Sequence, residues 1–327
     1  MNITTSPAVT SDPIPDGTSI YTDALPIDAA SRTPRRRERA LVLGGGGSAG
    51  NAWLIGVLAG LSDAGLDVTD ADLIIGTSAG ATAAAQISGA SLANLLADIV
   101  SASPPHAAPA RPAGGSRAAD RVAEQMRRTG DIIAASADAA DMRRRMGAAA
   151  IGLATAAEGS GPRWRSMVAP RLPRHDWSER PMLITAVDAE TGEPTVFDRS
   201  SGVELVDAVA ASTSSGTAYP IGGHWYIDGG YRASAKNADL AAGSARVLVL
   251  SPFGGAARTP AEWGLHLAHQ VDALRAGGSR VETIVPDDAG RAAFGDNAMD
   301  PSSRPPAARA GFAQGKGLAE RLTAFWS

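Results

Sequence analysis

The hydrophobic positions near the start of the ordered pattern form short continuous runs, each followed by a longer stretch with helical spacing. The apolar runs at residues 40–43 and 72–76 have the length of strands that are buried on both faces. Residues 52–64 and 77–89 have the spacing of helices. Strand–turn–helix units in series predict an α/β protein with a mostly parallel sheet and helices packed on it.

The second half of the chain returns to the same alternation. Two β runs within residues 181–198 flank a glycine-containing turn at residues 189–192, which predicts a hairpin. The patterns beyond it predict a helix at 202–213, a strand running into a turn at 224–230, a buried strand at 245–253, a helix at 259–278, a short strand at 281–287 and a helix at 317–326.

Two segments of the chain lack the alternation of strands and helices. Residues 1–38 are rich in Pro, Ser, Thr and Asp without apolar periodicity, which predicts a disordered N-terminal tail before a domain at residues 39–327. Residues 88–178 combine a Pro/Gly/Ala-rich stretch with helical spacing, which predicts a helical insertion. In it Met142 and Met146 share one helix side below a run of arginines. That side either packs on the domain or lies on a lipid surface.

Composition excludes several classes of function. The net charge of -4 gives no general attraction to nucleic acid, and the absence of cysteine excludes disulfides and thiolate catalysis. No apolar stretch reaches the roughly 18–20 residues of a membrane span. The N-terminus lacks the basic and apolar regions of a secretory signal, so we expect a cytoplasmic protein.

The letters GTSAG, from Gly76 to Gly80, match the pattern G-x-S-x-G between a buried strand and a helix. In this context the chain must turn sharply and hold Ser78 at the apex, and the two glycines relieve crowding of the backbone. The N-terminus of the following helix directs N–H groups and a positive dipole end toward the serine. The pattern predicts Ser78 as a nucleophile.

A glycine loop precedes the first predicted helix, and Gly45, Gly47 and Gly50 fit the dinucleotide-binding pattern G-x-G-x-x-G. A dinucleotide site needs an acidic residue at the end of the next strand, where this chain has glycine, threonine and serine. A P-loop needs a Lys-Ser/Thr pair, which does not follow the glycines. Free backbone N–H groups beside a nucleophile suit an oxyanion hole. We therefore expect no bound dinucleotide.

Asp228 ends an apolar strand and is followed by Gly229 and Gly230, which let a second backbone approach closely. A serine nucleophile needs a group that accepts its proton, and Asp228 is the candidate base, although the same letters also fit an ordinary turn. His266 and His269 follow Asp228 in the order of a Ser–acid–His triad. Their spacing places them inside a predicted helix without a glycine turn to present them.

The glycine loop, the GTSAG turn and the Asp-Gly-Gly turn resemble, in this order, the motifs of the patatin-like phospholipases, over about residues 39–326. The resemblance implies a three-layer α/β/α sheet domain that cleaves fatty-acyl esters of lipids through a Ser–Asp dyad, without a metal or other cofactor. It implies Ser78 as the nucleophile and Asp228 as the base. The implied oxyanion hole consists of the N–H groups of Gly45, Gly46, Gly47 and Ala79.

Ala49 departs from the family pattern, which usually has Arg or Lys immediately before the last glycine of the loop. This departure motivates an alternative, a non-catalytic lipid-binding or scaffold protein that has kept the fold. A Ser-Asp-His triad esterase is the second alternative. The predicted partners are a lipid ester and, through the insertion as a lid or interfacial surface, the periphery of a membrane, without nucleic acid.

Overall fold

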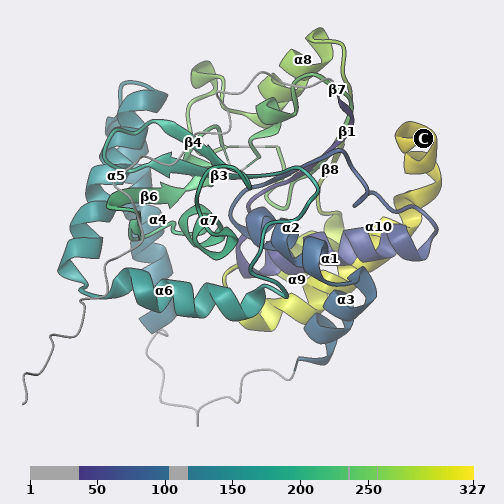
Figure 1. Ribbon diagram of the computed structural model, residues 1–327, viewed down its shortest axis with the longest axis horizontal. Helices are drawn as coiled ribbons and strands as arrows, with labels where there is room; N and C mark the ends of the chain where they lie inside the picture. The colour runs from purple at the N-terminus through teal and green to yellow at the C-terminus, as the bar shows by residue number, and fades with distance from the viewer. Residues whose placement is uncertain (1–36, 103–116, 235, 256) are drawn as a thin grey trace, which may run out of the picture.

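The computed structural model describes residues 37–102, 117–234, 236–255 and 257–327, and an eight-stranded sheet lies at its centre (Figure 1). The strand order is β5-β6-β3-β2-β1-β7-β8, and β4 pairs with β3. The run from β3 to β8 is parallel, whereas β4, β6 and β5 are added through antiparallel pairings. The strands are β1 (Arg37–Leu43), β2 (Leu73–Gly76), β3 (Met182–Asp188), β4 (Pro194–Phe197), β5 (Tyr219–Ile221), β6 (His224–Asp228), β7 (Ser244–Leu250) and β8 (Arg280–Ile284).

Helices cover both faces of the sheet. In the described residues they are α1 (Gly47–Asp63), α2 (Ala79–Gly89), α3 (Leu92–Ser101), α4 (Arg117–Ala135), α5 (Ala139–Ala156), α6 (Ser160–Val168), α7 (Leu205–Ser212), α8 (Leu267–Ala276), α9 (Asp288–Phe294) and α10 (Arg304–Trp326). Figure 1 shows α8 above the sheet and α1, α2, α3 and α10 below it. The predicted three-layer α/β/α architecture is confirmed.

The alternation of β1 explains the two layers. Leu41 and Leu43 belong to the larger buried cluster, which includes side chains of α1, α2, α7 and α10. Ala40 and Val42 point to the opposite face and belong to a smaller cluster with residues of α8. The strand is therefore apolar at successive positions because both of its faces are covered.

The helices α1 and α10 touch backbone to backbone. A Cβ atom on Gly56 would lie 2.2 Å from the carbonyl oxygen of Ala308, and one on Gly60 would lie 2.2 Å from that of Phe312. The two contacts advance along both helices in the same direction, so the helices run parallel. This packing places the first residue of α10 beside the first turn of α1.

The segment between β2 and β3 is helical, as predicted, and its described helices pack on the domain. Met142 and Met146 are 2% and 4% exposed and belong to a buried cluster under α5 that includes Ile227 of β6. Of the two interpretations of this helix, packing on the domain is therefore confirmed. The Pro/Gly/Ala-rich stretch at residues 103–116 lies outside the described residues.

Several predicted boundaries need correction. The predicted tail lies outside the described residues except for Arg37 and Glu38, which begin β1. The first helix begins at Gly47 rather than at residue 52, and α8 begins at Leu267 rather than at residue 259. The last helix begins at Arg304 rather than at residue 317, because prolines fit a first helical turn and glycines allow its close packing on α1. The helix α9 was not predicted.

Candidate active site

The register of the sheet brings the predicted nucleophile and base to one level. Gly76 of β2 pairs with Ile184 of β3, and Ala186, two residues farther along β3, pairs with Asp228 of β6. Ser78 is likewise two residues beyond Gly76. The carboxyl end of β2 and the end of the antiparallel strand β6 therefore meet at the same edge of the sheet.

Ser78 occupies a strained turn. Its backbone has φ 52° and ψ -114°, a conformation that is rare for a residue with a side chain. The Ser78 N–H donates to the hydroxyl oxygen of Ser212 over 2.9 Å, which anchors the turn. A Cβ atom on Gly80 would lie 1.9 Å from the carbonyl oxygen of Leu43. The turn is possible only because glycine occupies that position.

Asp228 is a buried carboxylate beside Ser78. The residue is 6% exposed, and its carboxylate accepts a hydrogen bond from the Gly230 N–H over 2.7 Å. Burial raises the pKa of Asp228 to about 6, and the Gly230 N–H and the neighbouring Ser78 side chain oppose that rise. The carboxylate is thus mostly ionised at neutral pH and lies beside Ser78.

The buried side chain of Asn237 connects several segments at the carboxyl edge of the sheet. The sequence analysis did not identify this residue. The Asn237 side chain donates to the hydroxyl oxygens of Thr77 and Thr185, over 2.9 and 3.1 Å, and to the carbonyl oxygen of Gly229 over 2.9 Å. It therefore links the middle of β3 to the residues that directly follow β2 and β6. The available signal was two threonines, one within and one directly after an otherwise apolar strand, which need a buried polar partner.

The glycine loop follows β1 and runs beside the Ser78 turn. Gly47 has φ +64° and is the first residue of α1, so its N–H group has no partner within that helix. Among the described residues no acceptor is recorded for the N–H groups of Gly45, Gly46, Gly47 or Ala79. The N–H of Gly50 is different, because it donates to the carbonyl oxygen of Gly46 within the helix.

The side chain at position 49 does not reach the site. Ala49 is fully buried in the larger cluster, and its N–H donates to the carbonyl oxygen of Ala298 over 2.9 Å. An Arg or Lys side chain at this position would have to enter the core. The departure from the family pattern at Ala49 therefore leaves the N–H groups of the preceding glycines unchanged.

The described histidines of the triad alternative have other neighbours. The His266 ring hydrogen-bonds with the carbonyl oxygen of Thr259 over 2.8 Å, and His269 packs beside Gly264. His224 lies 3.3 Å from a carboxylate oxygen of Glu190. Over the described ranges, the structure does not bring a histidine together with the serine and aspartate, nor does it contain three metal-ligating residues grouped as a metal site.

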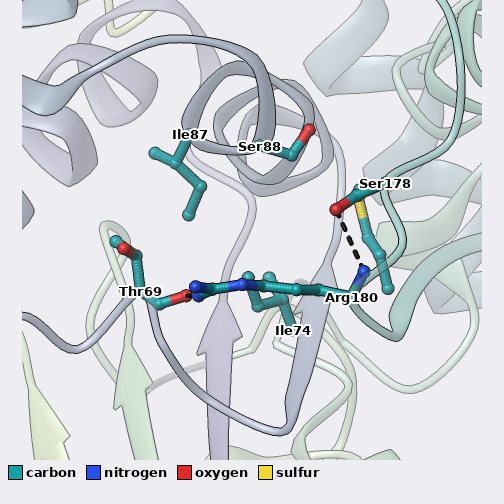
Figure 2. Close-up of a pocket in the computed structure, with 7 residues that line it drawn as sticks. Thr69, Ile74, Ile87, Ser88, Ser178 and Arg180 are labelled. Carbon is teal, nitrogen blue, oxygen red and sulfur yellow. Dashed lines mark hydrogen bonds between the residues drawn. The ribbon is translucent and has the colours of Figure 1, made fainter.

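A separate pocket of about 200 Å³ lies at the opposite, amino edge of the sheet. Figure 2 shows Arg180 extended between Thr69 and Ser178, with Ile74, near the start of β2, below it. The Arg180 guanidinium donates to the carbonyl oxygen of Thr69 over 2.6 Å. Because Ser78 follows the other end of β2, this pocket is remote from the proposed chemistry.

A comparison with models of protein families gives a match over most of the sheet domain. A family model described as Patatin-like phospholipase matches residues 41–241, from within β1 to the end of the short helix η4 (Ala238–Ala241). The match spans the glycine loop, Ser78 and Asp228. No curated protein matches the chain. A search of the described helices finds none with the length and apolar character needed to cross a membrane.

Proposed function

Because this chain belongs to the patatin-like phospholipase family, whose members act on lipids, we propose that it hydrolyses fatty-acyl esters with Ser78 as nucleophile and Asp228 as base. The single observation that supports this proposal most strongly is the placement of the buried Asp228 carboxylate beside the strained Ser78 turn, at the same level of the sheet. A base with a pKa of about 6 accepts a proton more readily than an exposed carboxylate and is still ionised at neutral pH.

Acylation proceeds in two steps. Ser78 Oγ attacks the ester carbonyl carbon while its proton moves to Asp228, which gives a tetrahedral oxyanion. The oxyanion then collapses, the bond to the alcohol oxygen breaks, and the departing alcohol takes the proton from Asp228. The acyl group remains on Ser78, and Asp228 is again ionised.

Deacylation repeats the sequence with water. A water molecule gives a proton to Asp228 and attacks the acyl carbon. The second tetrahedral intermediate releases the fatty acid, and Ser78 Oγ recovers its proton from Asp228. The cycle balances, since every proton that Asp228 accepts is returned within it and no atom changes its oxidation state.

The negative charge that develops on the carbonyl oxygen needs donors in place before the reaction. The N–H groups of Gly45, Gly46 and Gly47 and that of Ala79 are the proposed oxyanion hole, since they lie at the N-termini of α1 and α2. Helix N-termini also carry a partial positive charge. Fixed donors of this kind lower the barrier because they require no reorganisation during the reaction.

The part of α4 nearest the site is the proposed lid. The side chain of Gln125 donates to the carbonyl oxygen of Ser215, which also accepts from the Tyr231 hydroxyl over 3.0 Å. Ser215 follows Ser214, whose carbonyl oxygen accepts the Asp228 N–H over 3.1 Å. Movement of α4 would therefore displace residues that are hydrogen-bonded next to Asp228. The access of a lipid chain to the site would depend on this movement.

Labelling with a fluorophosphonate probe tests the proposal directly. Such a probe reacts covalently with an activated serine, so we expect labelling of the wild type and none of Ser78→Ala. Ser88→Ala is the matched control, because Ser88 lies at the other end of α2. An unlabelled but folded wild-type protein would favour the non-catalytic lipid-binding alternative.

A further inference from the structure

The side-chain amide of Asn237 is held at both of its ends. The residue is 0% exposed and directly precedes the short helix η4. Its side-chain oxygen accepts hydrogen bonds from the Ala233 N–H over 3.1 Å and from the Arg232 guanidinium over 3.2 Å. Because both of these partners can only donate, they fix the amide with its oxygen toward Arg232 and its nitrogen toward the sheet.

The amide nitrogen of Asn237 contacts both of the turns that hold the proposed dyad. It donates to Thr77 Oγ1 over 2.9 Å and to the carbonyl oxygen of Gly229 over 2.9 Å. Thr77 directly precedes Ser78, and Gly229 directly follows Asp228. One planar group therefore spans the distance between the two turns, and neither turn can move without stretching a hydrogen bond to it.

Two threonine hydroxyl groups extend these hydrogen bonds into the sheet. Thr77 Oγ1 and Thr185 Oγ1 lie 3.0 Å apart, and Asn237 also donates to Thr185 Oγ1 over 3.1 Å. Thr185 is fully buried in β3, which lies between β2 and β6. A Cβ atom on Gly229 would lie 2.1 Å from Thr185 Oγ1, so the turn after β6 approaches β3 this closely only as glycine. Hydrogen-bonded polar groups in such buried surroundings restrict one another's positions.

We propose that Asn237 is a positioning residue, which sets the distance and orientation between Ser78 and Asp228. The inference rests on the proposed function, since it concerns the same reaction. Proton transfer from a nucleophile to its base requires hydrogen-bond distance, so a small displacement of either turn slows the chemical step. The strained Ser78 backbone, with φ 52°, persists only where its surroundings enforce it. Ser212 holds the N–H of Ser78, and Asn237 holds the residue before it.

Gln270 of α8 provides a matched control in the same part of the fold. The residue is 4% exposed, and its side-chain oxygen accepts from the Ala238 N–H over 2.7 Å. Its side-chain nitrogen donates to the carbonyl oxygens of Ala233 and Leu265, over 2.6 and 3.0 Å. In the part of the chain that the structure describes, these hydrogen bonds do not reach the turns of the proposed dyad. Removal of the Gln270 amide should therefore lower stability without a specific effect on the chemistry.

The first test compares stability with turnover in Asn237→Gly and Gln270→Ala. Glycine is chosen at position 237 because this residue has φ 51°, which glycine adopts freely. Both changes leave buried polar groups without a partner and should lower the Tm by about 3–10 °C. Well below both Tm values, kcat for p-nitrophenyl butyrate should fall about 10²-fold in Asn237→Gly and less than about threefold in Gln270→Ala, with KM within about threefold of wild type in both. Equal losses of kcat would overturn the proposal.

Thr77 tests the same hydrogen bond from its other end and keeps the proposal testable if Asn237→Gly fails to fold. Thr77→Val keeps the volume of the side chain but cannot accept the Asn237 hydrogen bond, so kcat should fall about tenfold or more. Thr77→Ser keeps the hydroxyl and should restore kcat to within about threefold of wild type. Equal losses in both variants would show that packing, and not the hydrogen bond, matters at this position, which would contradict the proposal.

A double-mutant cycle measures whether the two residues act as one unit. The kcat of Thr77→Val/Asn237→Gly should lie within about threefold of the lower single variant, whereas the losses of Thr77→Val and Gln270→Ala should multiply. Multiplied losses in the first pair as well would exclude a shared role. The proposed function is judged on the wild type alone. If the wild type neither cleaves the ester nor reacts with the fluorophosphonate probe, that function fails, whereas an active wild type with an equally active Asn237→Gly overturns only the positioning role.

Discussion

The two edges of the central sheet use similar residue types under very different conditions. At the amino edge, Asp72 is exposed and accepts hydrogen bonds from the N–H groups of Glu38 and Arg39, over 3.0 and 2.9 Å. At the carboxyl edge, Asp228 is buried, and burial raises its pKa to about 6. Asp72 bonds to backbone N–H groups of β1 while its charge stays in contact with water. Asp228 is held in an environment that disfavours its charge.

The two serines at opposite ends of α2, Ser78 just before it and Ser88 in its last turn, show the same contrast. Ser88, near the amino edge, lies within the last turn of α2, and its hydroxyl donates to the carbonyl oxygen of Ala85 over 2.8 Å. Ser78, at the carboxyl edge, has a positive φ, and its turn depends on glycine at position 80. Backbone strain and a desolvated charge therefore occur together at one edge only. Such costs concentrate where function requires a fixed geometry.

The largest expected effect separates the two serines. Ser78→Ala removes the proposed nucleophile and should lower the turnover of p-nitrophenyl butyrate by about 10³-fold to 10⁶-fold. Ser88→Ala should keep nearly all activity, because its hydroxyl only bonds to the helix backbone. Steady-state hydrolysis rates check both variants. A Ser78→Ala enzyme that keeps more than about a tenth of the wild-type rate would exclude Ser78 as the nucleophile.

The second prediction separates the carboxylate from the histidines. Asp228→Asn cannot accept a proton and should lower kcat by about a thousandfold or more. His224→Ala, His266→Ala and His269→Ala should each keep at least about a tenth of wild-type kcat, because their rings contact neither Ser78 nor Asp228 in the described structure. One histidine variant as inactive as Ser78→Ala would replace the dyad with a triad.

The pH dependence of activity should sharpen the contrast between the two aspartates. The pKa of Asp228 is about 6, so kcat/KM should fall about tenfold per pH unit below that value as the base becomes protonated. A histidine base would give a similar limb near pH 6.5. The limb must therefore persist in His266→Ala and His269→Ala, and Asp72→Asn should leave it unchanged. Its disappearance in either histidine variant would contradict the assignment.

Glycine substitutions test whether the backbone at the carboxyl edge leaves room for a side chain. In Gly80→Ala the new Cβ atom would lie 1.9 Å from the carbonyl oxygen of Leu43, so the backbone must move and unfolding free energy should fall by about 3 kcal/mol or more. Gly152→Ala, on the exposed side of α5, meets nothing within 4 Å and should stabilise the protein by about 0.5–1 kcal/mol. Urea denaturation measures both. A tolerated Gly80→Ala would show that the turn can relax.

The last prediction is a pH-dependent gain in stability. Folding raises the pKa of Asp228 from 3.8 to about 6, so its contribution favours the folded state below pH 3.8 and is lost as pH rises through 6. At pH 8 the buried charge costs up to about 3 kcal/mol, and Asp228→Asn should recover about 1–3 kcal/mol of unfolding free energy. Urea denaturation at pH 8 and pH 4 checks this, and an equal gain at both pH values would contradict it.

Much of the fold was predictable because its signals are local. The two strand–turn–helix units, the hairpin between β3 and β4 and the α/β class follow from hydrophobic spacing and turn glycines within short windows of sequence, whereas the three-layer α/β/α architecture was implied by the family resemblance. The start of α10 was missed because it depends on a partner, α1, that lies far away in the chain. Its small residues have meaning only where two helix backbones meet.

For the candidate site, the sequence alone determined which residues could carry the chemistry. Three motifs carry this information: a serine between glycines at the end of a strand, a glycine loop before a helix and an aspartate before two glycines. In each motif, the residues that are adjacent in the sequence determine the backbone geometry. The catalytic roles of Ser78 and Asp228 remain predictions until the variants are measured. Only the tertiary structure decided the electrostatics, since a pKa depends on burial and on charges from distant segments. The pKa of the Asp228 carboxyl rose to about 6, and Arg304 came to lie against Ser48, 256 residues away, because packing brought those groups together.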